Sequence, residues 1–193
     1  MKTDIILAGV GGQGILSIAA VLGNAALENN YYIKQAETHG MSQRGGAVVS
    51  HLRISNQPIA SDLIPMGKAD LILSVEPMEA LRYVSYLKQE GYIVANSNPF
   101  INISNYPDIE TVLDEIKQHS NAVLINADAI AKEIGNVKAS NMVMLGAASP
   151  FINVPVKNIE SGISLLFEKK GKQISSLNLE AFNKGRIFSM QNQ

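Results

Sequence analysis

The apolar positions predict alternating strands and helices along most of the chain. The short apolar run Asp4–Gly9 is typical of a strand buried on both faces. After a cluster of glycines, apolar residues recur at helical spacing from Ile15 to Leu27, and Asn29-Asn30 ends this helix. The segment Tyr31–Glu37 is rich in β-forming residues and predicts the second strand. Strand, glycine turn, helix and strand within about forty residues form the βαβ unit of a nucleotide-type fold.

The segment Ala47–Ser55 alternates apolar and polar residues, which predicts a strand with one wetter face. The turn residues that follow it predict a hairpin with Ile59–Ile64, which would add an antiparallel edge to the sheet. Pro77 is well placed in the first turn of a helix that ends before Gly91. Further strands are expected at Ala69–Val75, Tyr92–Asn96 and Ala122–Ala127, and further helices at Asp108–Ser120, Asp128–Gly135, Ala139–Ser149, Val156–Lys170 and Asn178–Met190.

This order of elements predicts an α/β protein with a Rossmann-like, mostly parallel and doubly wound sheet, a possible antiparallel edge hairpin and a helical C-terminal part. No internal repeat or linker interrupts residues 1–193, so we expect a single domain. The length of 193 residues and the 46% hydrophobic content suit one domain with a core of its own.

The charge balance and the apolar runs exclude two classes of partner. With 16 basic and 17 acidic residues, the chain has no global positive field, so we expect no nucleic acid partner. The run from Ile5 to Leu27 holds no charged residue and is long enough to suggest a membrane span. Four glycines split it into two short pieces, which favours a buried strand and helix. We therefore expect no membrane partner and a cytoplasmic protein.

The chain contains no cysteine. It therefore cannot form a disulfide, bind zinc through thiolates or hold an iron–sulfur cluster ligated by cysteine. Any electron carrier of that kind must sit on another polypeptide.

The first glycine loop offers an anion a bare backbone. Gly9, Gly11 and Gly14 match the pattern G-x-G-x-x-G between a predicted strand and a predicted helix. Without Cβ atoms, an anion can approach the amides at the helix N-terminus, where the helix dipole is favourable. Gly12 adds a small residue, and the side-chain amide of Gln13 is expected to face the crevice. A tight turn that only lets the helix pack on the strand is an equally good explanation of these glycines.

The second glycine-rich loop, ETHGMSQRGG, begins at Glu37, 23 positions after Gly14. That spacing is close to where a dinucleotide-binding fold carries its ribose-binding acid. His39 and Arg44 could contact phosphate or carboxylate, Arg44 in a bidentate manner. Alternatively, His39 caps its own loop, and Arg44 pairs with Glu37 or with a partner chain. Gly40 and Gly45-Gly46 make this loop more elaborate than a plain strand-to-helix turn.

No self-contained catalytic site is apparent. The three histidines lie on different predicted elements, and no Ser–His–Asp order or metal-spaced histidine pair is present. Asp62, Asp70 and Asp128 look like turn or cap residues, and Glu76 precedes a proline that starts a helix. We therefore predict no catalytic residue and no metal site on this chain.

Four segments, GVGGQG, ETHGMSQRGG, ADLILSVEPMEALR and NSNP, resemble the gamma domain of the 2-oxoacid:ferredoxin oxidoreductases. The form ETHGMSQRGG is the specific part, and it resembles the small (beta) subunits of the indolepyruvate branch. The likeness is strong over roughly the first half of the chain. The helical C-terminal part matches in organisation only.

The resemblance implies a two-subunit enzyme that oxidatively decarboxylates indolepyruvate and similar aryl 2-oxoacids. The acyl group would pass to coenzyme A, and electrons would pass through iron–sulfur clusters to ferredoxin. Thiamine diphosphate and the 4Fe-4S clusters would belong to the large (alpha) subunit, in agreement with the missing cysteine.

In related enzymes the gamma domain helps bind coenzyme A, which makes the two glycine loops candidates for a coenzyme A contact or for the subunit interface. The candidate residues are Gly9, Gly11, Gly12, Gln13, Gly14, Glu37, His39, Gly40, Arg44, Gly45 and Gly46. The resemblance favours Arg44 as the phosphate partner and gives no residue a catalytic step.

Two alternatives remain open from the residues alone. The first glycine loop with Glu37 is also compatible with a free-standing NAD-dependent dehydrogenase. The second alternative is a Rossmann-like protein that binds a small molecule without catalysis.

Overall fold

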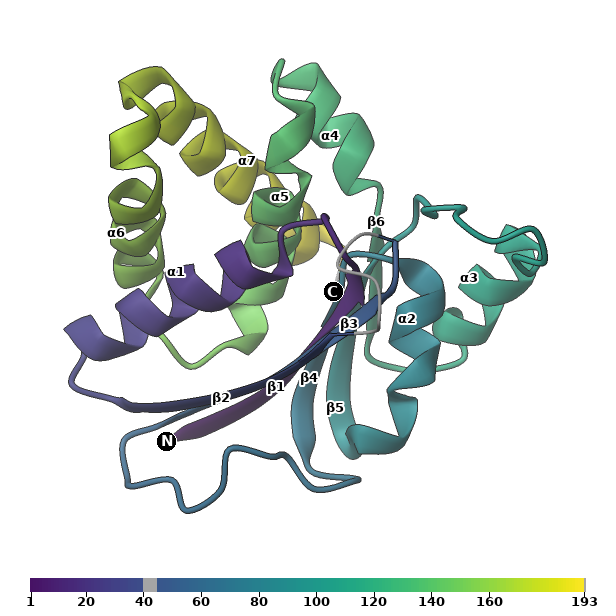
Figure 1. Cartoon of the computed structure of the whole chain (residues 1–193), viewed down its shortest axis with the longest axis horizontal. Helices are drawn as coiled ribbons and strands as arrows, with labels where there is room; N and C mark the ends of the chain where they lie inside the picture. The colour runs from purple at the N-terminus through teal and green to yellow at the C-terminus, as the bar shows by residue number, and fades with distance from the viewer. Residues whose placement is uncertain (40–44, 193) are drawn as a thin grey trace.

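The computed structural model describes residues 1–39 and 45–192. In this part of the chain six strands form one sheet in the order β2-β3-β1-β4-β5-β6 (Figure 1). The strands are β1 (Lys2–Val10), β2 (Tyr32–His39), β3 (Ala47–Ser55), β4 (Ala69–Ser74), β5 (Leu87–Asn96) and β6 (Ala122–Ile125). Strand β3 pairs antiparallel with both of its neighbours, whereas β1, β4, β5 and β6 pair in parallel. The predicted mostly parallel α/β fold is confirmed.

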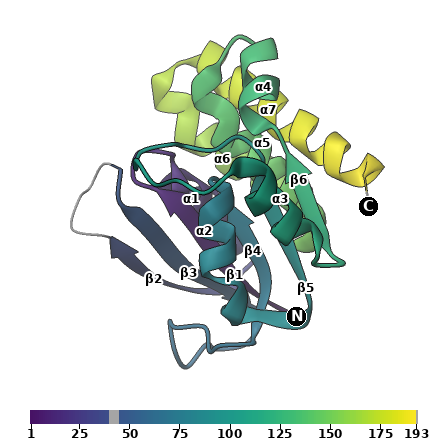
Figure 2. The same ribbon diagram turned by 90° about the vertical axis from the view of Figure 1, so that its right-hand side faces the viewer.

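The helices cover both faces of the sheet (Figures 1 and 2). They are α1 (Ile15–Glu28), α2 (Pro77–Arg82), α3 (Ile109–Lys117), α4 (Ala127–Glu133), α5 (Ser140–Ala148), α6 (Val156–Phe167) and α7 (Lys172–Gln191). Helix α1 and helices α4 to α7 pack on one face, and α2 and α3 pack on the other. Among the described helices, none is both long and apolar enough to cross a membrane.

Strand β1 divides its side chains between two cores. Ile5 and Leu7 belong to the core beneath α1 and α5 to α7, whereas Ile6 and Ala8 belong to the core beneath α2 and α3. Side chains on a strand alternate between faces, so the part of a strand that helices cover on both sides is expected to be a continuous apolar run. The uninterrupted apolar run near the N-terminus therefore correctly predicts a central strand.

The antiparallel hairpin forms at the edge of the sheet, but its partner differs from the predicted one. Strand β3 forms a hairpin with β2 and lies between β2 and β1, whereas the segment 56–68 contains no strand. Most of β3 is buried, as an interior position requires. Pro58 and Pro65 flank the segment that the sequence predicts as the partner, and a proline has no amide hydrogen to give to a strand ladder.

The helix predicted after Pro77 is shorter than its sequence pattern suggests. Helix α2 ends at Arg82, a 3₁₀ turn follows at Val84–Tyr86, and β5 begins at Leu87. Tyr86 packs edge-on against His51 of β3, with ring centroids 5.3 Å apart. Packing of this aromatic turn on the sheet overrides the helical spacing of the sequence.

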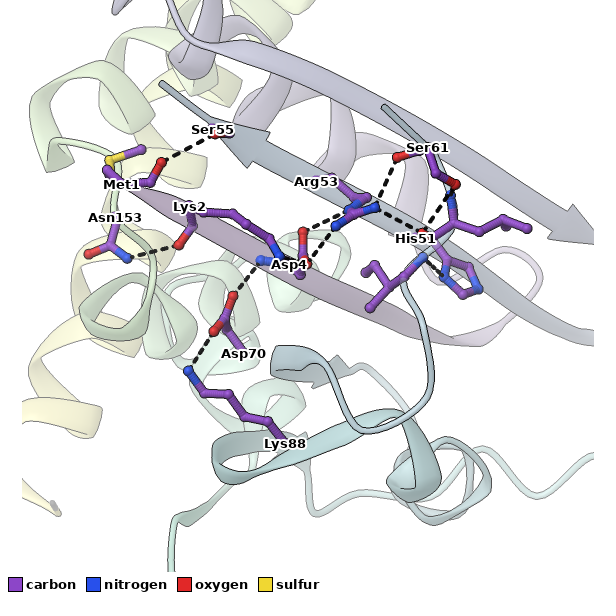
Figure 3. A network of polar contacts seen from close by, with 12 residues as sticks. Met1, Lys2, Asp4, His51, Arg53, Ser55, Ser61, Asp70, Lys88 and Asn153 are labelled. Carbon is purple, nitrogen blue, oxygen red and sulfur yellow. Dashed lines mark hydrogen bonds and ion pairs between the residues drawn. The ribbon is translucent and has the colours of Figure 1, made fainter. Parts of the chain in front are cut away.

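A network of polar side chains fixes the end of the sheet opposite the glycine turn (Figure 3). The carboxylate of Asp4 is fully buried and accepts two hydrogen bonds from Arg53, at 2.9 and 3.0 Å. The remaining terminal nitrogen of Arg53 donates to the carbonyls of Ser61 and Leu63, each at 3.0 Å. Arg53, which pairs with the buried Asp4 carboxylate, therefore also holds the loop 56–68 against the sheet.

Helices α5 and α7 cross so closely that their contact requires glycine. A Cβ atom on Gly146 would lie 1.9 Å from the carbonyl oxygen of Phe182, and one on Gly185 would lie 2.0 Å from that of Val143. No side chain fits at such distances. The two helices thus form one closely packed unit, which borders the site described below.

Candidate functional site

The glycine turn between β1 and α1 requires glycine at two positions for different reasons. A Cβ atom on Gly9 would lie 2.3 Å from the side chain of Val75 at the end of β4. Gly14 caps α1 with φ +80°, in the left-handed region that disfavours other residues, and its Cβ would lie 2.4 Å from Asn141. The turn is therefore held tightly against both β4 and α5.

Gln13 stabilises this turn from within. Its Oε1 accepts a hydrogen bond from the amide of Val10 at 2.8 Å, and its Nε2 donates to the carbonyl of Val75 at 3.3 Å. The sequence predicts that this side-chain amide faces the crevice, whereas in the structure it is engaged with the backbone. Gln13 still borders the cleft described below, and its contact with coenzyme A stays a prediction.

The N-terminus of α1 is not capped by any side chain of the described residues. No acidic residue lies in its first turn. The first amides of a helix lack intrahelical partners, and the helix dipole places positive potential there. This end of α1 favours an anionic group.

The two glycine loops lie side by side. The amide of Gly11 donates to the carbonyl of Gly46 at 2.9 Å, and the amide of Gly45 donates to the carbonyl of Gly11 at 3.4 Å. The side chain of Asn102, from the loop between β5 and α3, donates to the carbonyl of Gly45. Gly40, Arg44 and the side chain of His39 fall outside the described part of the chain.

A cleft of about 470 Å³ lies on the β2 side of the glycine turn. It is lined by Gly11, Gly12 and Gly14 together with Glu37. In a dinucleotide-binding fold the ribose-binding acid ends the strand next to β1. Here β3 occupies that place. Glu37 on β2 is therefore one strand further from β1, which displaces it by about 4.8 Å. This displacement does not favour the NAD-dependent alternative.

A larger cleft, of about 710 Å³, lies on the other side of the turn. Its lining residues come from the glycine turn, the ends of β4 and β5, helices α4 and α5 and the start of α7. The polar side chains on its walls include Asn96, Asp128, Lys138, Asn141 and Lys170. Two cations and one carboxylate give these five residues a net positive charge.

Asn141 leaves one buried polar atom of the larger cleft unsatisfied. The residue is 7% exposed, and its Nδ2 donates to the carbonyl of Gly14 at 3.1 Å. Its Oδ1 is buried and has no hydrogen-bond partner among the described residues. Such an atom is costly when no donor reaches it, and it lies beneath the surface of the cleft.

A buried carboxylate anchors the loop 97–108 beside the glycine loops. Glu76 is 1% exposed, caps α2 through the amide of Glu79 at 3.0 Å, and accepts a hydrogen bond from the hydroxyl of Tyr106. Burial raises the pKa of the Glu76 carboxyl, and the hydrogen bond from Tyr106 opposes this rise. The same loop carries Asn102, so the Glu76–Tyr106 contact helps place the tie to Gly45.

Sequence reasoning missed the residues that the fold brings to the turn from far along the chain. Asn141 is separated from Gly14 by 127 positions, and Lys138 and Lys170 also come from the helical C-terminal part. The segment NSNP includes Asn98, four positions before Asn102 in the sequence, but it does not indicate that the loop reaches Gly45. In the described residues, no three His, Asp or Glu side chains are placed to hold a metal ion.

Residues 4–188 match the family model described as pyruvate ferredoxin/flavodoxin oxidoreductase. The chain belongs to this family, which confirms the resemblance seen in the glycine loops.

Two relatives share the branch that the ETHGMSQRGG loop indicated. The chain is similar to indolepyruvate oxidoreductase subunit IorB of Pyrococcus horikoshii, with 36% identity over 94% of this chain and 93% of the relative. It is 34% identical to the subunit of the same name from Archaeoglobus fulgidus, over 96% and 94% of the two chains. These relatives are subunits of oxidoreductases that act on 2-oxoacids, and the likeness extends over nearly the whole chain.

Two solved structures share the fold. The gamma subunit of a keto/oxoacid ferredoxin oxidoreductase from Geobacter sulfurreducens matches with a TM-score of 0.72 and 21% identity, over 98% of this chain and 99% of that chain. The 2-oxoglutarate:ferredoxin oxidoreductase of Magnetococcus marinus, solved with 2-oxoglutarate, coenzyme A and succinyl-CoA bound, matches with a TM-score of 0.79 and 24% identity. There the match covers 98% of this chain but 31% of the longer chain.

Proposed function

We propose that this chain, as one gamma-type domain, is the small subunit of an indolepyruvate:ferredoxin oxidoreductase. The observation that carries the proposal is the similarity to IorB subunits over more than nine-tenths of both chains. The complex oxidatively decarboxylates an aryl 2-oxoacid: the carboxyl group leaves as carbon dioxide, the acyl group passes to the thiol of coenzyme A, and the released electrons reduce ferredoxin.

The redox work belongs to a large (alpha) subunit. The 4Fe-4S clusters reside there, since this chain has no cysteine to ligate a cluster, and we place thiamine diphosphate on the same subunit. The task left to the present chain is to bind and orient coenzyme A and to complete the assembled enzyme.

The larger cleft is the place where this chain contacts coenzyme A. The uncapped N-terminus of α1 and the side chains of Lys138 and Lys170 provide positive potential for its phosphates. The polar side chains on its walls provide partners for its N–H and O–H groups. Coenzyme A carries both kinds of group, and the bound coenzyme A in the Magnetococcus marinus enzyme supports the choice of ligand.

The face around this cleft meets the large subunit. Three exposed apolar side chains line the cleft, which are Phe100 (46% exposed), Val137 (60%) and Ile174 (38%), and the exposed Ile101 (69%) and Ile103 (41%) follow Phe100 in the same loop. Apolar groups gathered at one end of a sheet are typical of a surface that another protein covers. In the Magnetococcus marinus enzyme the matching fold is part of a longer chain, where it is covalently joined to the rest of that chain. This supports a contact between the present domain and another part of an assembled enzyme.

Co-expression with the large subunit tests the proposal. We expect the two chains to co-purify and the complex to reduce ferredoxin with indolepyruvate only when coenzyme A is present. Failure of the chains to co-purify, or a complex inactive with every aryl 2-oxoacid, would contradict the proposal. Calorimetric titration of the isolated chain with NAD tests the dehydrogenase alternative, for which micromolar binding, about −8 kcal/mol, would be required.

A further inference from the structure

We propose that Asp128 is a ligand-binding residue of the larger cleft, where it accepts a hydrogen bond from an uncharged N–H or O–H group of coenzyme A. This inference rests on the proposed function and deepens it. Asp128 lies at the second position of α4 and borders the cleft together with Lys138.

Two asparagines hold the Asp128 carboxylate in one orientation. Its Oδ2 accepts hydrogen bonds from the side-chain amide of Asn96 at 2.8 Å and from that of Asn98 at 3.1 Å. Asn96 is itself buried and fixed, because its Oδ1 accepts the amide of Ala127 at 3.1 Å. The carboxylate is therefore oriented before any ligand arrives.

The other oxygen of this carboxylate, Oδ1, receives no hydrogen bond from the described residues. A half-buried carboxylate with one satisfied and one open oxygen presents a directional, charge-assisted acceptor to the cleft. Such an acceptor repels phosphate and selects a neutral donor. A hydroxyl of the ribose, the amine of adenine or an amide of the pantetheine arm has this character.

A role in capping α4 does not explain the arrangement. The N-cap of α4 is Asn126, whose side chain accepts the amide of Ala129 at 2.9 Å, and the amide of Ala127 goes to Asn96. The amides of Ala127 and Ala129 in the first turn of this helix are thus satisfied without the Asp128 side chain. The expectation from sequence that Asp128 is a cap or turn residue accounts for its place in the chain but not for its two asparagine partners.

The charged groups of the cleft favour two kinds of contact with the ligand. Lys138, Lys170 and the amides at the start of α1 favour phosphate, whereas Asp128 does not. A ligand with anionic and neutral polar groups at separate positions fits this arrangement, and inorganic phosphate alone does not reach Asp128 with a favourable contact.

The substitution Asp128→Asn tests the proposal in the assembled enzyme. The new carbonyl can accept from Asn96 and Asn98 as before, so its NH₂ group faces the cleft, donor against donor. We expect the coenzyme A concentration at half-maximal rate to rise about tenfold or more, because a charge-assisted hydrogen bond is lost. The half-saturating concentration should rise by a larger factor than the maximal rate falls, and the melting temperature should drop by a few degrees at most, because Asp128 is also the acidic residue in the first turn of α4.

The matched control is Glu133→Gln, which removes one carboxylate from the same helix at an exposed position outside the cleft. Pantetheine in place of coenzyme A locates the donor. If Asp128→Asn weakens the use of coenzyme A but not of pantetheine, the donor lies in the nucleotide half, and if it weakens both, the donor lies in the pantetheine arm. Both results support the proposal.

An unchanged half-saturation for coenzyme A, or a loss equal to that of Glu133→Gln, would overturn the role of Asp128. Lys138→Ala separates this failure from that of the proposed function. If Lys138→Ala weakens coenzyme A use while Asp128→Asn does not, coenzyme A binds in the cleft and only the inference about Asp128 is wrong. If neither substitution has an effect, coenzyme A does not bind in this cleft, and both statements fail.

Discussion

The amide of Gly11 donates a hydrogen bond to the carbonyl of Gly46 over 2.9 Å, so the two glycine-rich loops of this chain are directly connected. One loop follows β1 and the other precedes β3, and β1 and β3 are neighbours in the sheet. The register brings this about, because Val10 at the end of β1 pairs with Ala47 at the start of β3. Any ligand that displaces one loop will therefore disturb the other.

The first prediction concerns Gly14→Ala. The new residue would adopt a left-handed conformation, which costs about 1–2 kcal/mol, and its Cβ would also lie 2.4 Å from Asn141. We expect a lower free energy of unfolding, measured by urea denaturation, and a higher half-saturating concentration of coenzyme A in the assembled enzyme.

Gly67→Ala is the matched control for this change. Gly67 has φ +69°, a Cβ added to it would meet no atom within 4 Å, and it lies in the loop 56–68. It should lose only the backbone contribution and keep wild-type coenzyme A kinetics. Equal effects of the two substitutions on coenzyme A would show that Gly14 matters for folding alone.

The second prediction concerns Asn102, which ties the loop 97–108 to Gly45. Asn102→Ala removes this tie from an exposed side chain, so the free energy of unfolding should change by less than about 1 kcal/mol. The second glycine loop loses a restraint, and we expect weaker use of coenzyme A or weaker assembly with the large subunit. Asn105→Ala, an exposed change in the same loop, should leave both properties as in the wild type.

The third prediction concerns the contact between Tyr106 and Glu76. Tyr106→Phe leaves a buried carboxylate oxygen without its donor, which should cost about 1–3 kcal/mol at neutral pH. Burial raises the pKa of Glu76 above 4.5, so its contribution to stability is fully present below that pH and is lost as the pH rises through the folded-state pKa. The cost of Tyr106→Phe should therefore shrink on acidification, since a protonated Glu76 needs the donor less.

Urea unfolding of the Tyr106 variant across a pH series measures this effect. Glu76→Gln provides the reference, because glutamine can still accept from the amide of Glu79 and carries no charge at any pH. In that background the cost of Tyr106→Phe should not depend on pH. A cost that is independent of pH in the wild-type background would contradict the prediction.

The fourth prediction concerns His51, whose Nδ1 accepts the amide of Ile64 at 3.1 Å. Burial lowers the pKa of His51 below 6.5, with Asp62 opposing and Arg53 assisting this change. The neutral imidazole therefore stabilises the fold above pH 6.5, and this stability is lost as the pH falls toward the folded-state pKa. Protonation would also turn the acceptor of the Ile64 amide into a donor.

We expect the free energy of unfolding to fall as the pH drops below 6.5, and His51→Asn to flatten this part of the profile. The asparagine carbonyl can replace Nδ1 as the acceptor without titrating. His119→Asn, outside this contact, serves as the control. An unchanged slope in the His51 variant would show that another group is responsible.

The order of strands and helices could be predicted from the sequence because it depends on local patterns. Apolar runs with their glycine and proline boundaries place β1, α1 and β4 near their observed positions. The hairpin partner of β3 could not be predicted from the sequence. The choice between β2 and the segment 59–64 depends on the order of the strands beside β1 in the folded sheet. Pairing between distant segments has no signature in either segment alone.

The candidate site divides in the same way. The glycine loops are contiguous motifs, so Gly9, Gly11 and Gly14 could be found from spacing alone, although their ligand could not. Asn141 and Asp128 come from other elements and reach the same cleft only through the packing of α4 and α5. The role of Gln13 could not be predicted either, because both of its polar atoms bond to backbone groups whose positions depend on the turn.

Hydrogen–deuterium exchange of the assembled complex, with and without coenzyme A, tests the central claim most directly. The amides from Gly12 to Leu16 and those at the start of α5 should exchange more slowly when coenzyme A is bound, because the phosphates cover the turn and the start of α5 lines the same cleft. Slower exchange confined to the large subunit at saturating coenzyme A would contradict it.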